Sequence, residues 1–162
     1  MTDATLSCDG KGDGLVLSRA GLDDLDQVVA LQKAAYARNR ELLGLEPLPL
    51  LVDYTEIFAN HEVWVARTGE AIRAALIVEL RPDDLLIFSV SSEPGQQGRG
   101  LGGALLAAAE VRARETGRSV IRLYTGSTLQ HLIDWYSRHG FAVEQIEELE
   151  DRAVAHMAKE LA

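Results

Sequence analysis

The fold of this chain is decided by residues 90–106, which read Val90-Ser91-Ser92-Glu93-Pro94-Gly95-Gln96-Gln97-Gly98-Arg99-Gly100-Leu101-Gly102-Gly103-Ala104-Leu105-Leu106. Here a β-type run ends, a proline interrupts it, and four glycines within six residues open an Ala/Leu-rich run of helical character. The first turn of a helix has N–H groups without partners and the positive end of the helix dipole. Glycines at that turn let a pyrophosphate approach the backbone closely, so the stretch predicts an anion-binding helix start. The alternative, a plain flexible loop, leaves glycines inside a helix start unexplained.

The same glycines fit the pattern G-x-G-x-x-G, through Gly98, Gly100 and Gly103. A dinucleotide-binding fold carries that pattern after its first strand and ends its second strand on an acidic residue. Here the pattern lies about two-thirds of the way along the chain, and the next strand, residues 120–124, ends without an acid. No Gly-Lys-Ser/Thr follows either, which excludes a Walker loop. The sequence therefore disfavours a nicotinamide site.

Regular patterns of apolar residues predict the elements on both sides of this turn. Ahead of it, the spacing predicts a strand at 15–17, helices over 22–35 and 50–59, and three sequential antiparallel strands at 62–67, 72–80 and 85–91. After it come a helix over 101–115, a strand at 120–124, a helix over 129–136 and strands at 141–146 and 153–159. This order predicts an α/β (α+β) fold with a mixed, mostly antiparallel sheet of six to seven strands and helices on both faces. We expect one domain, residues 14–162, after a flexible tail, residues 1–13.

The composition limits the possible partners. Sixteen basic residues against 25 acidic ones give a net charge of −9, which argues against nucleic acid and is compatible with a cationic substrate. The single cysteine, Cys8, excludes an internal disulfide, and the scattered histidines predict no metal site. No apolar run is long enough to cross a membrane, so we expect a cytoplasmic protein without a membrane partner.

Two motifs at the right separation resemble the GNAT superfamily of N-acetyltransferases. The first is Val-x-Val-x-Pro-x-x-Gln/Arg-x-x-Gly-x-Gly/Ala, matched here by Val90, Ser92 in place of the second valine, Pro94, Gln97, Gly100 and Gly102. The second, Tyr-x-x-x-Gly-Phe, is matched by Tyr136, Gly140 and Phe141. The order of elements also fits over roughly residues 15–160. Residues 62–66 and 123–125 look like a bacterial branch of the superfamily whose substrates are mostly unassigned.

The resemblance implies transfer of an acetyl group from acetyl-CoA to a primary amine by direct attack, with no metal. It implies strands 85–91 and 120–124 splayed apart, and backbone N–H groups near Val90–Ser92 stabilising the charge that develops on the carbonyl oxygen. The residues implied to bind the cofactor are Val90, Ser91, Ser92, Gln97, Gly98, Arg99, Gly100, Leu101, Gly102 and Gly103. Tyr136 matches the tyrosine that protonates the leaving thiolate. A core tyrosine on an amphipathic helix is the alternative for that residue.

The sequence departs from the family pattern where a base is expected. Many members place a glutamate on the strand before the glycine turn. In this branch we expect it two residues before the first valine, and that position is Phe88. The base is then a water chain, is absent, or lies elsewhere, where the candidates are Glu79, Glu93, His131 and Asp134. Glu79 is preferred among them because a carboxylate in an apolar strand can have a raised pKa. The alternative for Glu79, a solvated glutamate at the end of a strand next to Arg81, is favoured over a catalytic role. The missing glutamate leaves a second interpretation open, a degenerate domain that binds acyl-CoA as a sensor or partner subunit without catalysis.

The acceptor, a small molecule or a peptide amine, is not readable from the sequence. The resemblance implies that its cleft is shaped by the first two helices and the loop near the last strands. The polar and aromatic residues that could line it are Tyr36, Arg38, Arg40, Asp53 and Tyr54. A homodimer is compatible with the sequence, which identifies no surface for it.

Overall fold

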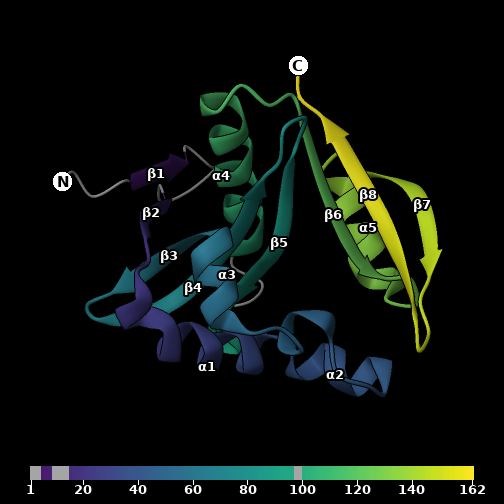
Figure 1. The fold of residues 1–162 in the computed structure, drawn as a ribbon, viewed down its shortest axis with the longest axis horizontal. Helices are drawn as coiled ribbons and strands as arrows, with labels where there is room; N and C mark the ends of the chain where they lie inside the picture. The colour runs from purple at the N-terminus through teal and green to yellow at the C-terminus, as the bar shows by residue number, and fades with distance from the viewer. Residues whose placement is uncertain (1–4, 9–14, 97–99) are drawn as a thin grey trace.

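The computed structural model describes residues 5–8, 15–96 and 100–162, whose strands form one twisted sheet (Figure 1). Its eight strands lie in the order β1-β2-β3-β4-β5-β6-β8-β7. All neighbours are antiparallel except β5 and β6. The strands are β1 (Thr5–Cys8), β2 (Leu15–Arg19), β3 (Glu62–Thr68), β4 (Ala71–Leu80), β5 (Leu85–Ser92), β6 (Val120–Gly126), β7 (Ala142–Glu148) and β8 (Ala153–Glu160).

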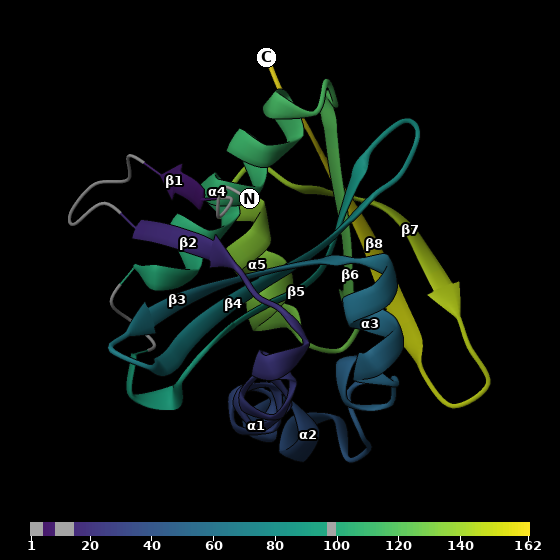
Figure 2. The same ribbon diagram turned by 60° about the vertical axis from the view of Figure 1, so that its left-hand side comes forward.

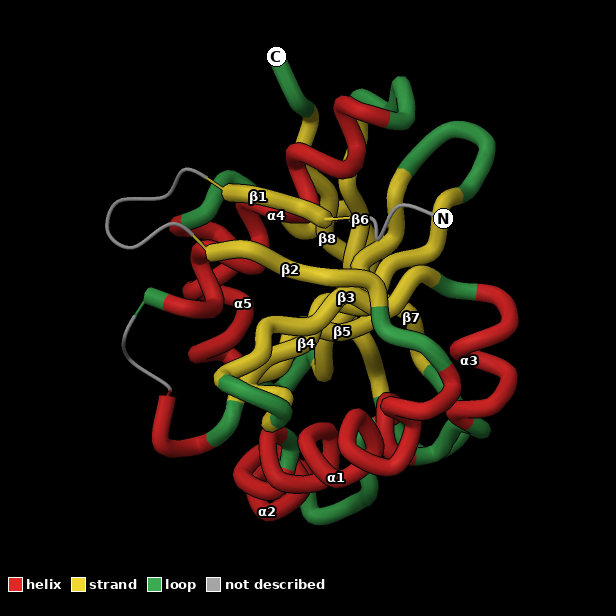
Figure 3. Tube along the Cα trace, turned by 90° about the vertical axis from the view of Figure 1, so that its left-hand side faces the viewer, coloured by secondary structure: helices red, strands yellow, loops and turns green. Residues whose placement is uncertain are grey.

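Helices cover both faces of this sheet (Figures 2 and 3). They are α1 (Leu25–Ala35), α2 (Ala37–Leu43), α3 (Tyr54–Asn60), α4 (Leu101–Glu115) and α5 (Gln130–Arg138), with 3-10 turns η1 (Leu22–Asp24), η2 (Leu48–Leu50) and η3 (Pro94–Gln96). Helix α4, with Leu105 and Leu106, packs on one face together with Tyr136 of α5. Helices α1 and α3, through Val28 and Ile57, pack on the other. Successive side chains of the central strands point to opposite faces of the sheet, so they form two hydrophobic cores, one on each face.

The predicted fold class is confirmed, with one more strand than expected. Residues Thr5–Cys8 were expected in a flexible tail, but they pair with β2 over four residues and bring the sheet to eight strands. Leu6 is 1% exposed and belongs to the core beneath α4. A strand of four residues with one buried leucine shows too little alternation of apolar and polar residues to be recognised from the sequence. Helix α2, which ends at the left-handed Gly44, was also not predicted.

The start of β5 is fixed to β6 by a buried carboxylate. Asp84 is 4% exposed, and both its oxygens accept hydrogen bonds from Arg81, at 2.6 Å. One of them also accepts from Arg122 on β6, at 2.8 Å, and Arg122 in turn donates to Glu144 on β7. The hydrogen bonds from Arg81, followed by those from Arg122, hold the pKa of Asp84 below its usual value. This cluster joins three strands at the end of the sheet where β5 and β6 meet.

We expect Asp84→Asn to lower the free energy of unfolding by about 2 kcal/mol, because an amide replaces charge-assisted hydrogen bonds to two guanidinium groups. Since the pKa is lowered in the folded state, the carboxylate stabilises the protein fully above the unfolded pKa of about 4, and the contribution is lost as the pH falls through the folded pKa. Urea unfolding at pH 6 and pH 3 measures both effects. The neighbouring Asp83→Asn, at an exposed position, is the control and should change little. An equal effect of the two substitutions would show that the cluster does not hold β5.

Candidate active site

Strands β5 and β6 touch at one end and separate toward the other. Their parallel register covers three pairs, from Leu85 with Ile121 to Ile87 with Leu123. Beyond Ile87 no described strand pairs with this edge of β5, and Figure 1 shows β6 moving away toward α2. The predicted splaying of the two strands is therefore confirmed. It leaves backbone groups of β5 without a sheet partner on the side that faces the opening.

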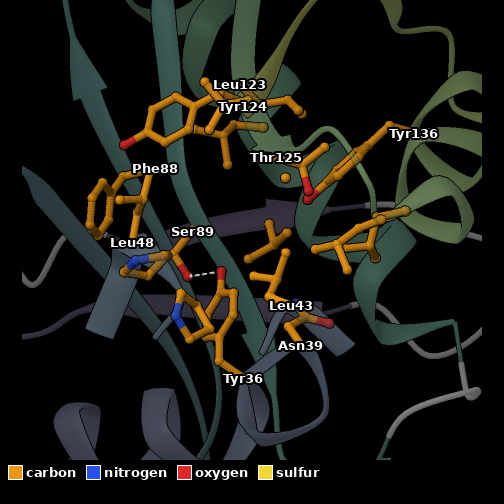
Figure 4. Close-up of a pocket in the computed structure, with 18 of the residues that line it drawn as sticks. Tyr36, Asn39, Leu43, Leu48, Phe88, Ser89, Leu123, Tyr124, Thr125 and Tyr136 are labelled. Carbon is orange, nitrogen blue, oxygen red and sulfur yellow. Dashed lines mark hydrogen bonds between the residues drawn. The ribbon is translucent and has the colours of Figure 1, made fainter. Parts of the chain in front are cut away.

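A cavity lies in this opening (Figure 4). The free space in it, including the part that is open to solvent, amounts to about 690 Å³. Its walls come from α2 and the segment after it, the diverging ends of β5 and β6, the start of β8, and α5. Its lining includes Tyr36, Leu43, Leu48, Phe88, Ser89, Val90, Tyr124, Leu129, Tyr136 and Arg152.

A β-bulge at Phe88 sets which side chains of β5 reach the cavity. Ile77 of β4 pairs with Ser89 but the next residue, Val78, pairs with Ile87, so Phe88 is an extra residue in β5. A bulge interrupts the alternation of a strand. Phe88 packs with the core beneath α1, and Ser89 turns to the same face, where it contacts α1. The bulge thus places an aromatic ring and a hydroxyl side by side on the cavity wall.

A chain of hydrogen bonds fixes the Ser89 hydroxyl. Tyr54 Oη donates to the carbonyl oxygen of Pro49 at 2.7 Å, so its oxygen accepts the hydrogen bond from Gln32 Nε2 at 2.9 Å. The second hydrogen of the fully buried Gln32 amide goes to Ser89 Oγ, also at 2.9 Å. The carbonyl of Pro49, which can only accept, therefore determines the orientation of the Gln32 amide.

The chain ends at Tyr36, on the cavity wall. Ser89 Oγ and Tyr36 Oη lie 2.9 Å apart, and either can donate to the other. Whichever donates, one O–H of the pair keeps its hydrogen free of the described residues. Burial raises the pKa of Tyr36 and raises that of Tyr54 to about 12, so both phenols stay protonated near neutral pH. The cavity floor therefore presents a neutral hydroxyl pair.

Tyr136 reaches the same cavity from α5. Its ring packs against Trp135, with centroids 5.0 Å apart, and against Phe141 at 5.9 Å. Burial raises its pKa, which keeps the phenol protonated. No described residue hydrogen-bonds to its hydroxyl. Tyr136 is thus held in the aromatic core by its ring while its O–H remains available to a ligand.

Residues 59–143, more than half of the chain, match the family model described as Acetyltransferase (GNAT) domain. The chain belongs to the GNAT acetyltransferase family. A curated relative, mycothiol acetyltransferase of Propionibacterium freudenreichii subsp. shermanii, is 30% identical over 148 aligned residues, which cover 81% of this chain. The match takes in 44% of that relative, so the chain spans less than half of its length.

Solved structures of GNAT proteins share the fold. The ribosomal-protein-S18-alanine N-acetyltransferase of Escherichia coli superposes with a TM-score of 0.73 at 18% identity, over 90% of this chain and 93% of that one. An acetyltransferase of Bacillus subtilis in complex with CoA gives 0.65 at 18% identity, over 90% and 97%. At this level of identity the likeness establishes the GNAT fold of the chain.

The GNAT glycine turn is partly described. Gly100 has φ +77° and forms the N-cap of α4 without a side-chain hydrogen bond, so the described side chains leave the first N–H groups of α4 uncapped. Of the predicted cofactor residues, Gln97, Gly98 and Arg99 lie outside the described residues. Ser91 and Ser92 are buried at the end of β5, Val90 lines the cavity, and Leu101 begins α4.

Gly102 and Gly103 have a second reason to be glycines. A Cβ on Gly102 would lie 2.9 Å from Cζ2 of Trp135, and one on Gly103 would lie 3.3 Å from Nε2 of His139. The contacts are with a side chain of α5 and with that of its C-cap residue, so these glycines leave room for the two rings against the start of α4. From the sequence both glycines were predicted to serve the pyrophosphate alone, and the structure adds a packing role next to Tyr136.

The candidate bases do not line the cavity. Glu93 forms an ion pair with Arg73, at 2.8 Å. His131 and Asp134 are exposed on α5, and Glu79 lies on β4 opposite Leu86. Since none of the described lining residues is Asp or Glu, the cavity of this GNAT protein has no carboxylate base among them.

The acceptor-side candidates divide in a similar way. Tyr36 lines the cavity. Tyr54 lies outside the lining and accepts the hydrogen bond from Gln32, which in turn donates to Ser89. Asp53 caps α3 by accepting from Thr55 N, while Arg38 and Arg40 are outside the lining. Helix α2, which brings Leu43 to the cavity wall, was not predicted from the sequence. The available signal was Gly44, because glycine is frequent just after the last residue of a helix. Arg152 was not among the predicted residues, although it lies in the loop between β7 and β8, near the last strands, where the family pattern implied a wall of the cleft.

Two further observations apply to the described part of the chain. It contains no group of three or more His, Cys, Asp or Glu side chains placed to hold a metal ion. None of its helices is long and apolar enough to cross a membrane.

We expect Gly102→Ala to lower the free energy of unfolding by about 1 kcal/mol, or about 3 °C in Tm, because the new methyl group displaces the Trp135 ring. The displacement should also reduce any activity that depends on Tyr136, since the two rings are in contact. Thermal unfolding measures the first effect. Gly95→Ala is the matched control, because a Cβ there meets no described atom within 4 Å. An unchanged Tm for Gly102→Ala would show that α4 and α5 do not need the glycine to pack.

Proposed function

We propose that this chain is an N-acetyltransferase that moves the acetyl group of acetyl-CoA to a primary amine by direct attack within a ternary complex. The observation that carries the proposal is the opening between β5 and β6, where an unpaired strand edge, a cavity and the hydroxyl of Tyr136 come together. The Bacillus subtilis protein of the same fold, in complex with CoA, supports the choice of cofactor.

The residues present fit a coenzyme A molecule. The uncapped first turn of α4 at Gly100 offers N–H donors and the positive end of the helix dipole to the pyrophosphate. The predicted binding set is Val90, Ser91, Ser92, Gln97, Gly98, Arg99, Gly100, Leu101, Gly102 and Gly103. The free edge of β5 provides backbone groups for an extended ligand such as the pantetheine arm, and acetyl-CoA supplies an activated thioester.

Residues of the chain then act on the carbonyl group that is attacked and on the sulfur that leaves. A neutral amine forms the C–N bond at the thioester carbonyl while the C–S bond breaks. Backbone N–H groups of β5 near Val90 stabilise the charge on the carbonyl oxygen. Tyr136 donates its proton to the departing sulfur and regains one from solvent, and the amine loses its extra proton to solvent. No described carboxylate in the cavity takes part.

The same lack of a described carboxylate in the lining favours a second candidate function. In it, the domain binds acyl-CoA as a sensor or partner subunit without catalysis. Amine-dependent thiol release separates the two candidates, because the second function binds the cofactor but releases no thiol when amines are added.

We expect acetyl-CoA and free CoA to bind the purified protein with micromolar affinity in isothermal titration calorimetry. Gly100→Asp should weaken both at least ten-fold, because a carboxylate at the start of α4 repels the pyrophosphate. Gly69→Asp is the matched control: Gly69 also has positive φ, at 63°, and open space for a side chain, but lies in the β3–β4 turn. No binding of either ligand to the wild-type protein near millimolar concentration would overturn the proposed function.

We expect Tyr136→Phe to reduce kcat at least ten-fold, the scale for loss of a general acid, with little change in acetyl-CoA affinity. The Tm should stay the same, because no described residue hydrogen-bonds to the lost hydroxyl. Tyr124→Phe, which removes another hydroxyl from the lining, is the control and should keep kcat within about two-fold of wild type. Unchanged turnover of Tyr136→Phe would remove Tyr136 from the mechanism and leave the alternative of a core tyrosine.

A further inference from the structure

We infer that the acetyl acceptor of this cavity is a primary amine on an apolar body that carries no second positive charge. The inference rests on the proposed acetyltransferase function and adds the chemical class of the substrate. It follows from three properties of the cavity: the charge of its lining, the apolar wall formed by α2, and the neutral hydroxyl pair on its floor.

The charge of the lining differs from that of the whole chain. The sequence has nine more acidic than basic residues, yet the described lining contains no acidic residue and one basic residue, Arg152. An ammonium group that leaves water needs a carboxylate or several hydrogen-bond acceptors to compensate for its lost hydration. A second ammonium group on the acceptor would find no carboxylate among these residues. The described lining itself therefore holds none of the overall negative charge. The nearby carboxylate of Glu79, on β4, acts on it from outside and adds to burial in raising the pKa of Tyr124.

Arg152 does not make the cavity a strong anion site either. Its side chain is 8% exposed, and its guanidinium is paired with both oxygens of Asp151 at 3.1 Å. A third N–H donates to the carbonyl oxygen of Glu46, at 2.7 Å. Arg152 connects the start of β8 to the segment after α2. Because Asp151 neutralises its charge, Arg152 does not require an acidic substrate.

One wall of the cavity is built from leucines that are far apart in sequence. Gly126, at the end of β6, leaves the space that two of them fill: Leu43 Cδ2 and Leu129 Cδ1 would lie 3.1 and 3.3 Å from a Cβ at that position. Leu48 and Phe88 continue the apolar surface toward β5 (Figure 4). An alkyl or aryl body gains free energy by leaving water for such a surface.

The hydroxyl pair provides the place for the amine itself. Gln32 fixes Ser89 Oγ, and Ser89 lies 2.9 Å from Tyr36 Oη, so the position of both oxygens is set by the fold. A phenol oxygen can accept an N–H from a neutral amine while it takes part in the bond to Ser89. Tyr36 thus holds the nitrogen at the bulge of β5, where the strand edge is free.

The test compares hexylamine with 1,6-diaminohexane, which share a six-carbon chain and differ in the second amine. With saturating acetyl-CoA and thiol release as the readout, we expect kcat/KM to be at least ten-fold higher for hexylamine. A diamine that is used equally well or better would overturn this inference and leave the transferase function intact. Lack of turnover with every amine, in protein that binds acetyl-CoA, would instead overturn the transferase function, and this inference with it.

Substitutions of two neighbouring leucines of α2 test whether the acceptor binds against this wall. Leu43→Glu puts a carboxylate into the wall, and we expect the preference for hexylamine to shrink at least five-fold or reverse. Leu42→Glu makes the same change on the same helix at a residue that is 54% exposed, and should leave the preference unchanged. Leu48→Glu is the second variant if Leu43→Glu does not fold. A preference that neither Leu43→Glu nor Leu48→Glu alters would show that the acceptor does not lie against this wall.

Discussion

The parallel contact between β5 and β6 is the interaction on which the site depends, because it is short. Three residue pairs join the strands, and the Asp84 cluster fixes that end of the contact. A longer ladder would close the opening and pair the backbone groups of β5 that face it. A weaker one would let the two halves of the sheet separate. The opening therefore exists because the ladder is strong at one end and stops at Ile87.

The glycine turn and Tyr136 are linked through packing as well as chemistry. Gly102 and Gly103 let α4 approach α5, where the Trp135 and His139 rings fill the space that side chains on α4 would occupy. Trp135 in turn contacts Tyr136. The helix whose first turn is proposed to hold the pyrophosphate is thus also the helix that positions the proposed acid. In this family pattern one glycine can serve two functions, so its presence alone does not prove ligand binding.

The parts of the structure that were predictable from sequence are those with local signals. The period of two over 62–91, the Ala/Leu run after Gly100 and the Tyr136-to-Phe141 motif predicted the central strands, α4, and the end of α5. The cavity floor had no such signal, because Gln32 and Ser89 are separated by 57 residues and meet through a bulge at Phe88. The position of Phe88 was identified from the family pattern as lacking a glutamate. That its neighbour would present a fixed hydroxyl there depends on pairing with β4, which sequence spacing does not specify.

The neutral cavity explains how the proposed transfer can proceed without a carboxylate base. A base in the site is needed when an amine binds as an ammonium ion, and that ion is poorly compensated by phenols, a serine and leucines. An amine that enters neutral has already released its proton to water, so the site has to position it and does not have to deprotonate it. Burial raises the pKa of Tyr136, so its phenol is protonated near neutral pH and can hydrogen-bond to the sulfur that leaves. The apolar surroundings that replace the glutamate at Phe88 are in this way consistent with both halves of the reaction.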